Sequence, residues 1–121
     1  MMSTVTEQEL ITRAVLDYME GWFDGDAARM ERAVHRDLVK RRPGDDQAAS
    51  LGITTAERMV ELTMRGEGKA VAADRRIDIE IVDVYEDVAS VTVRTTPYHE
   101  YLHLVRTHDG WKIANVLWRP T

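Results

Sequence analysis

Apolar and aromatic residue types typical of β-strands dominate the last third of the chain, and short polar segments interrupt them. Four runs are rich in valine, isoleucine, threonine and aromatic residues, at 77–85, 88–96, 98–107 and 111–118. Because these residue types suit a pleated surface, each run predicts one strand. Asp109-Gly110, between the last two runs, is a strong hairpin signal since glycine tolerates a positive φ. The pattern predicts consecutive antiparallel strands with very short turns.

The first half of the chain has helical spacing instead. Apolar residues between Leu10 and Trp22 recur every three or four positions, which predicts an amphipathic helix over about residues 6–23. Thr6 and Glu9 fit a capping box at its start. Further patterns predict a shorter helix at 27–34 and another after Thr54-Thr55. A short strand is expected at 38–41. We therefore expect one α+β domain over 1–121: a curved antiparallel sheet of four main strands plus short strands, wrapped around three N-terminal helices as a cone-shaped barrel.

Composition narrows the class of protein. The chain has 121 residues, 44% hydrophobic and 31% charged, which is typical of a globular domain with one core. A net charge of −5 argues against nucleic-acid binding, and without cysteine there is neither a disulfide framework nor a thiolate nucleophile. Residues 1–7 lack the features of a secretory signal, and no apolar run suggests a membrane span. We expect a cytoplasmic protein without membrane or nucleic-acid partners.

The expected turn at Asp109-Gly110 decides which residues share a face of the sheet. A two-residue turn there pairs Leu104 with Asn115 and Leu102 with Leu117. The face expected to pack on the helices then carries Glu100, Leu102, Leu104, Trp111, Ile113, Asn115 and Leu117. The opposite face carries Tyr101, His103, Val105, Ala114, Val116 and Trp118. Because this second face is also apolar and aromatic, we expect it to form a homodimer interface.

Several local strings resemble the nuclear-transport-factor-like superfamily of cone-shaped α+β barrels, most closely its putative lumazine-binding branch. They are Tyr18–Trp22 with Gly25-Asp26, Val34–Leu38 with Arg41, Glu100–Leu104, and Asp109–Asn115 through Trp118. The superfamily includes ketosteroid isomerases and polyketide cyclases, and the branch name suggests pteridine-like ligands. The isomerases carry a carboxylate base just after the second helix, whereas the matching stretch here is Lys40-Arg41-Arg42. The resemblance thus implies the fold, without steroid isomerisation.

Two residues are candidates for catalysis. Glu100, if it faces an apolar hollow, could act as a general base; it could also pair with Arg41 or Lys112, or simply be exposed. His35 follows the second helix and could serve as acid or base, although binding a backbone carbonyl is an equally ordinary role.

Four residues are candidates for ligand binding. Tyr18 and Trp22 lie four apart on one helix face and could offer a hydroxyl and a stacking surface, or be core aromatics. Asn115 would need a hydrogen-bond partner if buried, and Arg41 could anchor an anion or remain a solvated loop residue.

No metal site or cofactor is expected. His99, Tyr101 and His103 share one face, but two histidines without a third ligand make a weak metal site, so we interpret them as interface residues.

Three functions remain open. The first is a small-molecule-binding domain for an apolar or aromatic ligand. The second is a cofactor-free isomerase, cyclase or dehydratase that uses Glu100 or His35 as base, with Tyr18 or Asn115 as donor. The third is a dimeric interaction module with a filled hollow, suggested by Tyr101 and Trp118.

Overall fold

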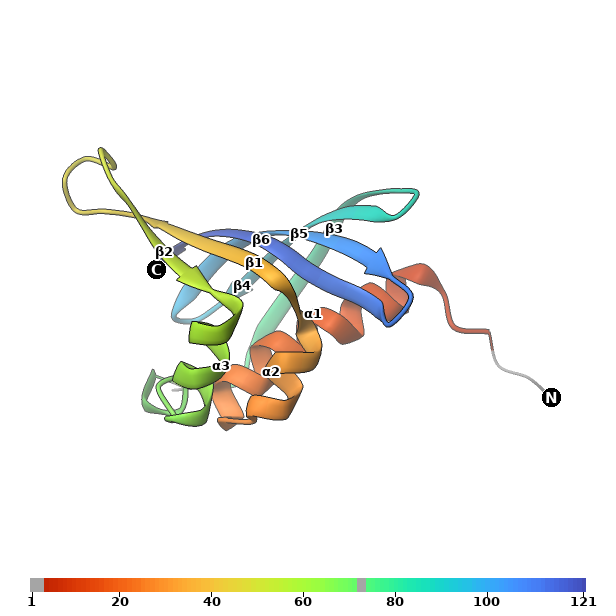
Figure 1. The fold of residues 1–121 in the computed structure, drawn as a ribbon, viewed down its shortest axis with the longest axis horizontal. Coiled ribbons are helices and arrows are strands. Elements are labelled where there is room, and N and C mark those ends of the chain that lie inside the picture. The colour runs from red at the N-terminus through yellow and green to blue at the C-terminus, as the bar shows by residue number, and fades with distance from the viewer. Residues whose placement is uncertain (1–3, 72–73) are drawn as a thin grey trace.

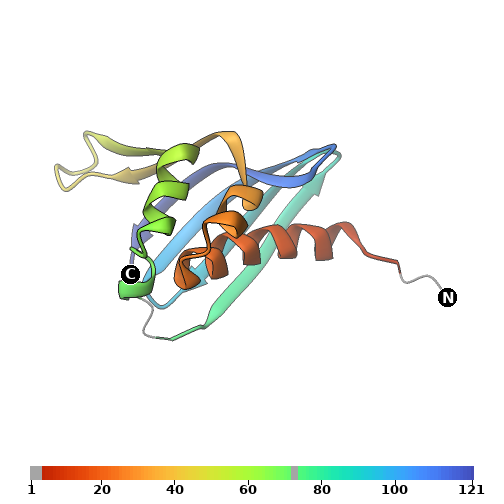
Figure 2. The same cartoon turned by 60° about the horizontal axis from the view of Figure 1, so that its bottom comes forward.

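The computed structural model describes residues 4–71 and 74–121. The helices lie together on one face of a single curved sheet (Figures 1 and 2). In chain order the elements are α1 (Glu7–Asp24), α2 (Ala27–Ala33), β1 (Val34–Pro43), β2 (Leu51–Thr55), α3 (Ala56–Met64), a short 3₁₀ turn η1 (Lys69–Val71), β3 (Ile77–Tyr85), β4 (Val88–Thr95), β5 (Tyr98–Thr107) and β6 (Gly110–Pro120). This confirms the predicted α+β fold of three helices and a curved sheet. The first three residues, on which the expected absence of a signal partly rests, lie outside the described residues.

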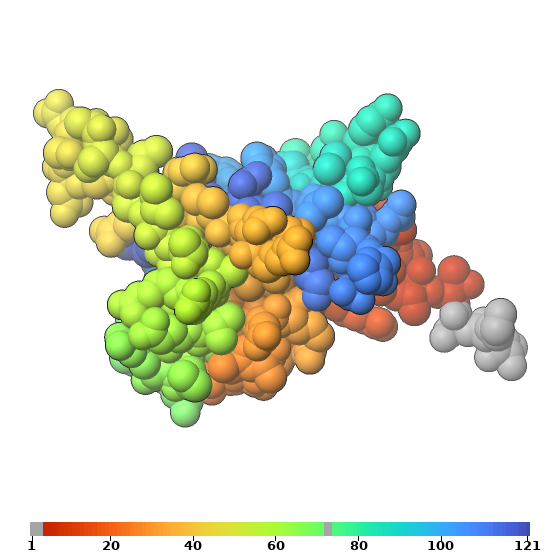
Figure 3. All heavy atoms as spheres, in the orientation of Figure 1, coloured from red at the N-terminus to blue at the C-terminus, as the bar shows by residue number. Residues whose placement is uncertain are grey.

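The predicted elements match closely, with two differences. The short strand expected at 38–41 is the middle of the longer β1, and β2 was not predicted. The sheet order is β2-β1-β6-β5-β4-β3, and β1 runs parallel to β6 while all other neighbours are antiparallel. The β1–β2 hairpin reaches beyond the helices and forms a projection on the surface (Figure 3).

The helix ends follow the sequence. The hydroxyl of Thr6 accepts a hydrogen bond from the backbone N–H of Glu9, and Asp26 caps α2 in the same way. Gly25 ends α1 with φ of 68°, a left-handed conformation that glycine adopts without strain. Within the described residues, none of the helices is long and apolar enough to cross a membrane.

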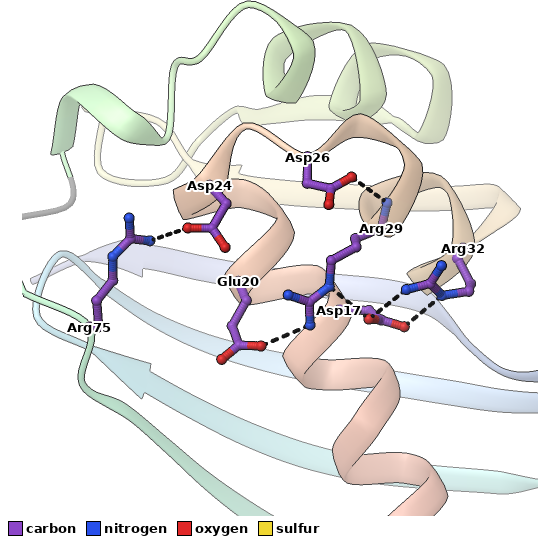
Figure 4. A network of polar contacts seen from close by, with 7 residues as sticks. All are labelled: Asp17, Glu20, Asp24, Asp26, Arg29, Arg32 and Arg75. Atoms are coloured by element: carbon purple, nitrogen blue, oxygen red, sulfur yellow. Dashed lines mark hydrogen bonds and ion pairs between the residues drawn. The ribbon is translucent and has the colours of Figure 1, made fainter.

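Charged side chains fix α2 against α1 (Figure 4). The carboxylate of Asp17 in α1 forms ion pairs with the guanidinium groups of Arg29 and Arg32, with N–O distances of 2.9 and 3.0 Å. Arg29 also pairs with the carboxylate of Glu20 at 2.8 Å. Burial disfavours the charge of Asp17, but the hydrogen bonds from Arg32 and Arg29 outweigh burial and lower its pKa.

The predicted register of the last hairpin is wrong. Thr107 pairs with Gly110, so the turn residues are His108 and Asp109, and Gly110 takes its φ of 104° just after them. The pairing then shifts between His103 and Leu104, because Ala114 is an extra residue in β6. Beyond this bulge every side chain of β6 changes face, which is the expected effect of a one-residue slip.

The bulge corrects the assignment of the two faces. Glu100, Leu102, Leu104, Trp111 and Ile113 are buried toward the helices, as predicted. Val116 and Trp118 join them, whereas Asn115 and Leu117 lie on the outer face. The hypothesis of a dimeric interaction module expects Trp118 on the outer face, and this expectation is wrong.

Candidate functional site

A cavity of about 90 Å³ opens between the helices and the sheet. It is lined by residues of α1, α3 and four strands: Tyr18, Met19, Trp22, Lys40, Thr54, Met59, Leu62, Tyr98, Glu100 and Trp118. This volume exceeds the roughly 10–15 Å³ of probe volume that a single water molecule needs. Most of the lining is aromatic or aliphatic, and its charged members are Lys40 and Glu100.

Three polar side chains contact one another in this cavity, and we call Tyr18, Lys40 and Glu100 the polar triad. The Tyr18 hydroxyl donates to Oε1 of Glu100 at 2.6 Å, and Lys40 Nζ donates to the Tyr18 oxygen, also at 2.6 Å. The Lys40 ammonium lies 3.3 Å from the same carboxylate oxygen. The three residues come from α1, β1 and β5, so the triad exists only in the folded chain.

The triad is almost completely removed from solvent. The side chain of Glu100 is 2% exposed and that of Lys40 is 12% exposed. An isolated charge at this depth would be strongly disfavoured, so each charge depends on the other and on Tyr18. Burial raises the pKa of the Tyr18 phenol well above its usual range, and the neighbouring Glu100 charge raises it further. Tyr18 therefore stays a hydrogen-bond donor at neutral pH.

The second carboxylate oxygen of Glu100 takes no part in the contacts of the triad. Both contacts of the triad go to Oε1. Across residues 4–71 and 74–121, Oε2 has no hydrogen-bond donor, yet it is not among the fully buried atoms that lack one. Oε2 therefore keeps some accessible surface, and Glu100 lines the cavity. A carboxylate oxygen in this position can accept a hydrogen bond from an entering molecule.

Aromatic side chains form the walls around the triad. The Trp22 indole N–H donates to the Tyr98 hydroxyl at 3.0 Å, and the Tyr98 ring meets Trp118 edge to face at 5.4 Å. Lys40 Nζ lies 4.9 Å from the centre of the Trp118 ring, close enough for a cation–π contact. The pKa of Tyr98 is raised by burial, against the Trp22 hydrogen bond, so its hydroxyl also remains a donor.

Three of the six predicted site residues meet in the cavity. Glu100, Tyr18 and Trp22 all line it. Glu100 pairs with Lys40, so the expected alternative of pairing with Arg41 or Lys112 is wrong. Arg41 is exposed on the outer face, where it aligns with Ile53 and Leu117.

The other two, Asn115 and His35, lie elsewhere. Asn115 is exposed beside His103 because of the bulge, so its expected place inside is wrong. His35 lies near the start of β1, where its Nδ1 accepts the backbone N–H of Asp37 at 3.0 Å. Its neighbour Val34 pairs with Ile113 of β6, whereas Glu100 pairs with Trp118, five residues further along that strand. The two proposed bases are thus not brought together.

Sequence reasoning missed Lys40, Tyr98 and Trp118. In the sequence Lys40 belongs to a basic run, but it lies two positions after the apolar Leu38, and residues two apart on a strand share a face. That signal was available in the sequence. Trp118 was placed outside because the bulge at Ala114 has no local sequence signature.

The outer face carries the remaining histidine candidates. The rings of His99 and Tyr101 lie 5.1 Å apart, and His103 is exposed nearby. In the part of the chain that the structure describes, no three His, Asp or Glu side chains are grouped so that they could hold a metal ion.

Several solved structures are similar to the structure of this chain. An NTF2-like protein from Cytophaga hutchinsonii matches with a TM-score of 0.72 at 14% identity, covering 97% of this chain and 100% of that one. An NTF-2 like protein of unknown function from Silicibacter pomeroyi gives 0.70 at 17% identity, with 97% and 100% covered. A ketosteroid isomerase-like protein from Erwinia carotovora atroseptica gives 0.63 at 18% identity, with 97% and 98% covered. These identities establish a shared fold alone.

The family comparison goes further than the fold. No relative was found among curated proteins. The model of one family, described as putative lumazine-binding, matches residues 6–119, which is nearly the whole chain. The chain therefore belongs to the putative lumazine-binding family, and its fold is similar to that of NTF2-like proteins.

Proposed function

We propose that the domain binds a small, flat, neutral molecule in the cavity of the polar triad. The observation that carries the proposal is the free Oε2 of Glu100 beside the Lys40 ammonium. Lys40 has three N–H donors, of which one goes to Tyr18 and one faces Glu100, so one remains. An acceptor and a donor side by side match the neighbouring N–H and C=O groups of a cyclic amide.

The charge of the site supports a neutral ligand. The carboxylate of Glu100 and the ammonium of Lys40 balance each other, so neither a cation nor an anion gains a net attraction. Trp22, Tyr98 and Trp118 supply flat surfaces for a ring. The family description names lumazine, a pteridine-dione whose pyrimidinedione ring has this amide edge.

Size limits how much of the ligand is enclosed. The cavity of about 90 Å³ is much smaller than the roughly 300–1,000 Å³ of typical ligand pockets. We propose that a single ring enters, with its amide edge toward Glu100, and that any second ring stays at the mouth.

Calorimetric titration with lumazine and with uracil tests this proposal. Both should bind, and Glu100→Gln should weaken binding about tenfold or more, since a hydrogen bond to a charged group contributes about 1.5–3 kcal/mol. The matched ligand control is 1,3-dimethyllumazine, which lacks the N–H groups. The matched protein control is Asn115→Ala on the outer face. Absence of binding, or equal affinity for the dimethyl compound, contradicts the proposal.

A second candidate, cofactor-free proton transfer, has one observation in its favour. The same free Oε2 of Glu100 could accept a proton from a bound ligand, while the Tyr98 hydroxyl, 3.0 Å from the Trp22 indole, could donate to the ligand's oxygen. Its test is loss of exchange of an acidic ligand C–H with deuterated water in Glu100→Gln, with the ligand still bound.

The expected homodimer remains a prediction. What supports it is the exposure of Tyr101, at 55%, and Leu117, at 47%, which lie opposite each other on the outer face.

A further inference from the structure

Lys40 lies in a different environment from the other two lysines of the chain. Its side chain is 12% exposed and lines the cavity. Lys69 is exposed, and Lys112 donates to the backbone carbonyl of Arg32 at 2.7 Å. We infer that Lys40 is a nucleophile that condenses reversibly with small aldehydes or ketones entering the cavity. This inference rests on the proposed function only in requiring that a small molecule can enter.

The contacts of Lys40 supply what an amine needs to attack a carbonyl. The attacking nitrogen must first lose a proton, and Glu100 Oε1 lies 3.3 Å from Nζ, in position to take it. The carbonyl oxygen must be stabilised as it gains charge, and the cavity offers the Tyr98 hydroxyl as a further donor. Tyr18 bridges Nζ and the carboxylate with two contacts of 2.6 Å, and so holds the two groups together.

Aromatic rings lie close to the Nζ atom of Lys40. It lies 4.9 Å from the Trp118 ring centre and 5.2 Å from that of Tyr18, so little of its shell is water. These rings also stabilise the ammonium form, and the role of Glu100 as proton acceptor is therefore essential. Condensation releases one water molecule, and the reverse reaction is hydrolysis of the imine. A cavity of about 90 Å³ lined by aromatic side chains has little room for the water that hydrolysis needs.

The reaction balances with groups in the cavity. Glu100 takes a proton from the Lys40 ammonium, which gives an amine and a carboxylic acid. The amine nitrogen forms a bond to the carbonyl carbon, and a proton moves from nitrogen to oxygen to give a carbinolamine. Glu100 returns its proton to the hydroxyl, the C–O bond breaks, and water leaves. The product is a protonated imine on Lys40 beside the Glu100 carboxylate, with the same total charge as at the start.

Reductive trapping tests the inference on the intact chain. The protein is incubated with propionaldehyde or benzaldehyde and sodium cyanoborohydride, and each lysine is followed by peptide mass spectrometry. We expect Lys40 to be labelled at least about tenfold faster than Lys69, although Lys69 is the more exposed, because positioned general acid–base groups contribute about 10²–10⁴-fold. Labelling of Lys40 no faster than Lys69 overturns the inference. This comparison needs no variant.

Variants then separate the chemistry from ligand entry. Glu100→Gln should slow labelling of Lys40 about 100-fold while labelling of Lys69 stays constant. Lys69→Arg is the matched control and should leave the Lys40 rate unchanged, with circular dichroism reporting on folding. If Glu100→Gln folds and labels Lys40 at the normal rate, the assigned role of Glu100 is wrong. If uracil binds in calorimetry but aldehydes are not trapped, this inference is contradicted and the proposed function stands. If aldehydes are trapped but uracil does not bind, the inference stands and the proposed function is contradicted.

Discussion

The hydroxyl of Tyr18 donates a 2.6 Å hydrogen bond to Oε1 of Glu100, joining α1 to β5 across 82 positions of sequence. Lys40, from β1, completes the contact with both groups. Three elements that share no local sequence signal therefore meet at one buried point. The proposed chemistry depends on this point.

Removing the cation of the triad should destabilise the fold. Lys40→Met leaves the Glu100 carboxylate buried without its counter-charge, and breaking a buried pair in this way typically costs about 3–5 kcal/mol. Urea unfolding measures the loss. The double variant Lys40→Met with Glu100→Leu should recover part of it, because no unpaired charge is then buried. A loss below about 1 kcal/mol, as for an exposed ion pair, would show that the pair is solvated.

Alkaline pH should destabilise the protein through Tyr18. The pKa of Tyr18 is raised in the folded state, first by burial and then by Glu100, so the unfolded chain loses this proton at lower pH than the folded chain. Above the ordinary tyrosine value of about 10, the unfolded state binds fewer protons, and the free energy of unfolding falls as pH rises.

The comparison that isolates this effect is Tyr18→Phe. Its unfolding free energy, measured by urea titration between about pH 9 and pH 11, should decline less steeply than that of the unaltered protein. Parallel curves for the two proteins would mean that Tyr18 titrates normally.

Gly68 lies against the end of α1, and a larger residue there should be poorly tolerated. A Cβ at this position would overlap the carbonyl oxygen of Trp22 and lie 2.7 Å from its Cδ1. We expect Gly68→Ala to lower the free energy of unfolding by about 1–3 kcal/mol, as for overpacking of a core. Gly52→Ala is the control, since its Cβ would meet only the Arg42 carbonyl at 3.7 Å. Equal thermal midpoints for the two variants would refute this packing argument.

A charge on the outer face should separate the predicted homodimer. Leu117 is 47% exposed there and lies opposite Tyr101, so Leu117→Asp places a carboxylate in the middle of the expected interface. Analytical ultracentrifugation should show a dimer for the unaltered chain and a monomer for the variant, with unchanged circular dichroism. A monomer before substitution, or a dimer after it, rules out this interface.

Most of the fold could be predicted from the sequence because its signals are local. The strands at 77–85 and 98–107 and the cap at Thr6 depend on residue type and spacing within a few positions. The register of the last hairpin could not be predicted, because the extra residue Ala114 looks like any other strand residue in the sequence. That one position moved Asn115 outward and Trp118 inward.

The candidate site was predictable only in part. Glu100 stands out as a charge between apolar neighbours on the inner face, and Tyr18 and Trp22 follow from helical spacing. The pairing of Glu100 with Lys40 could not be read from the sequence, because β1 reaches β5 only through β6 in the sheet order. Long-range register, which local patterns do not contain, decides which charges meet.

The three tryptophans report directly on whether a small cyclic amide enters the cavity of the polar triad. Trp22 and Trp118 line the cavity, whereas the Trp111 indole donates to Glu7 at 2.6 Å and does not line it. In a ¹⁵N-labelled sample titrated with lumazine, we expect saturable shifts of the Trp22 and Trp118 indole signals and a constant Trp111 signal. Unchanged Trp22 and Trp118 signals at saturating ligand, or a shift confined to Trp111, would contradict this proposal.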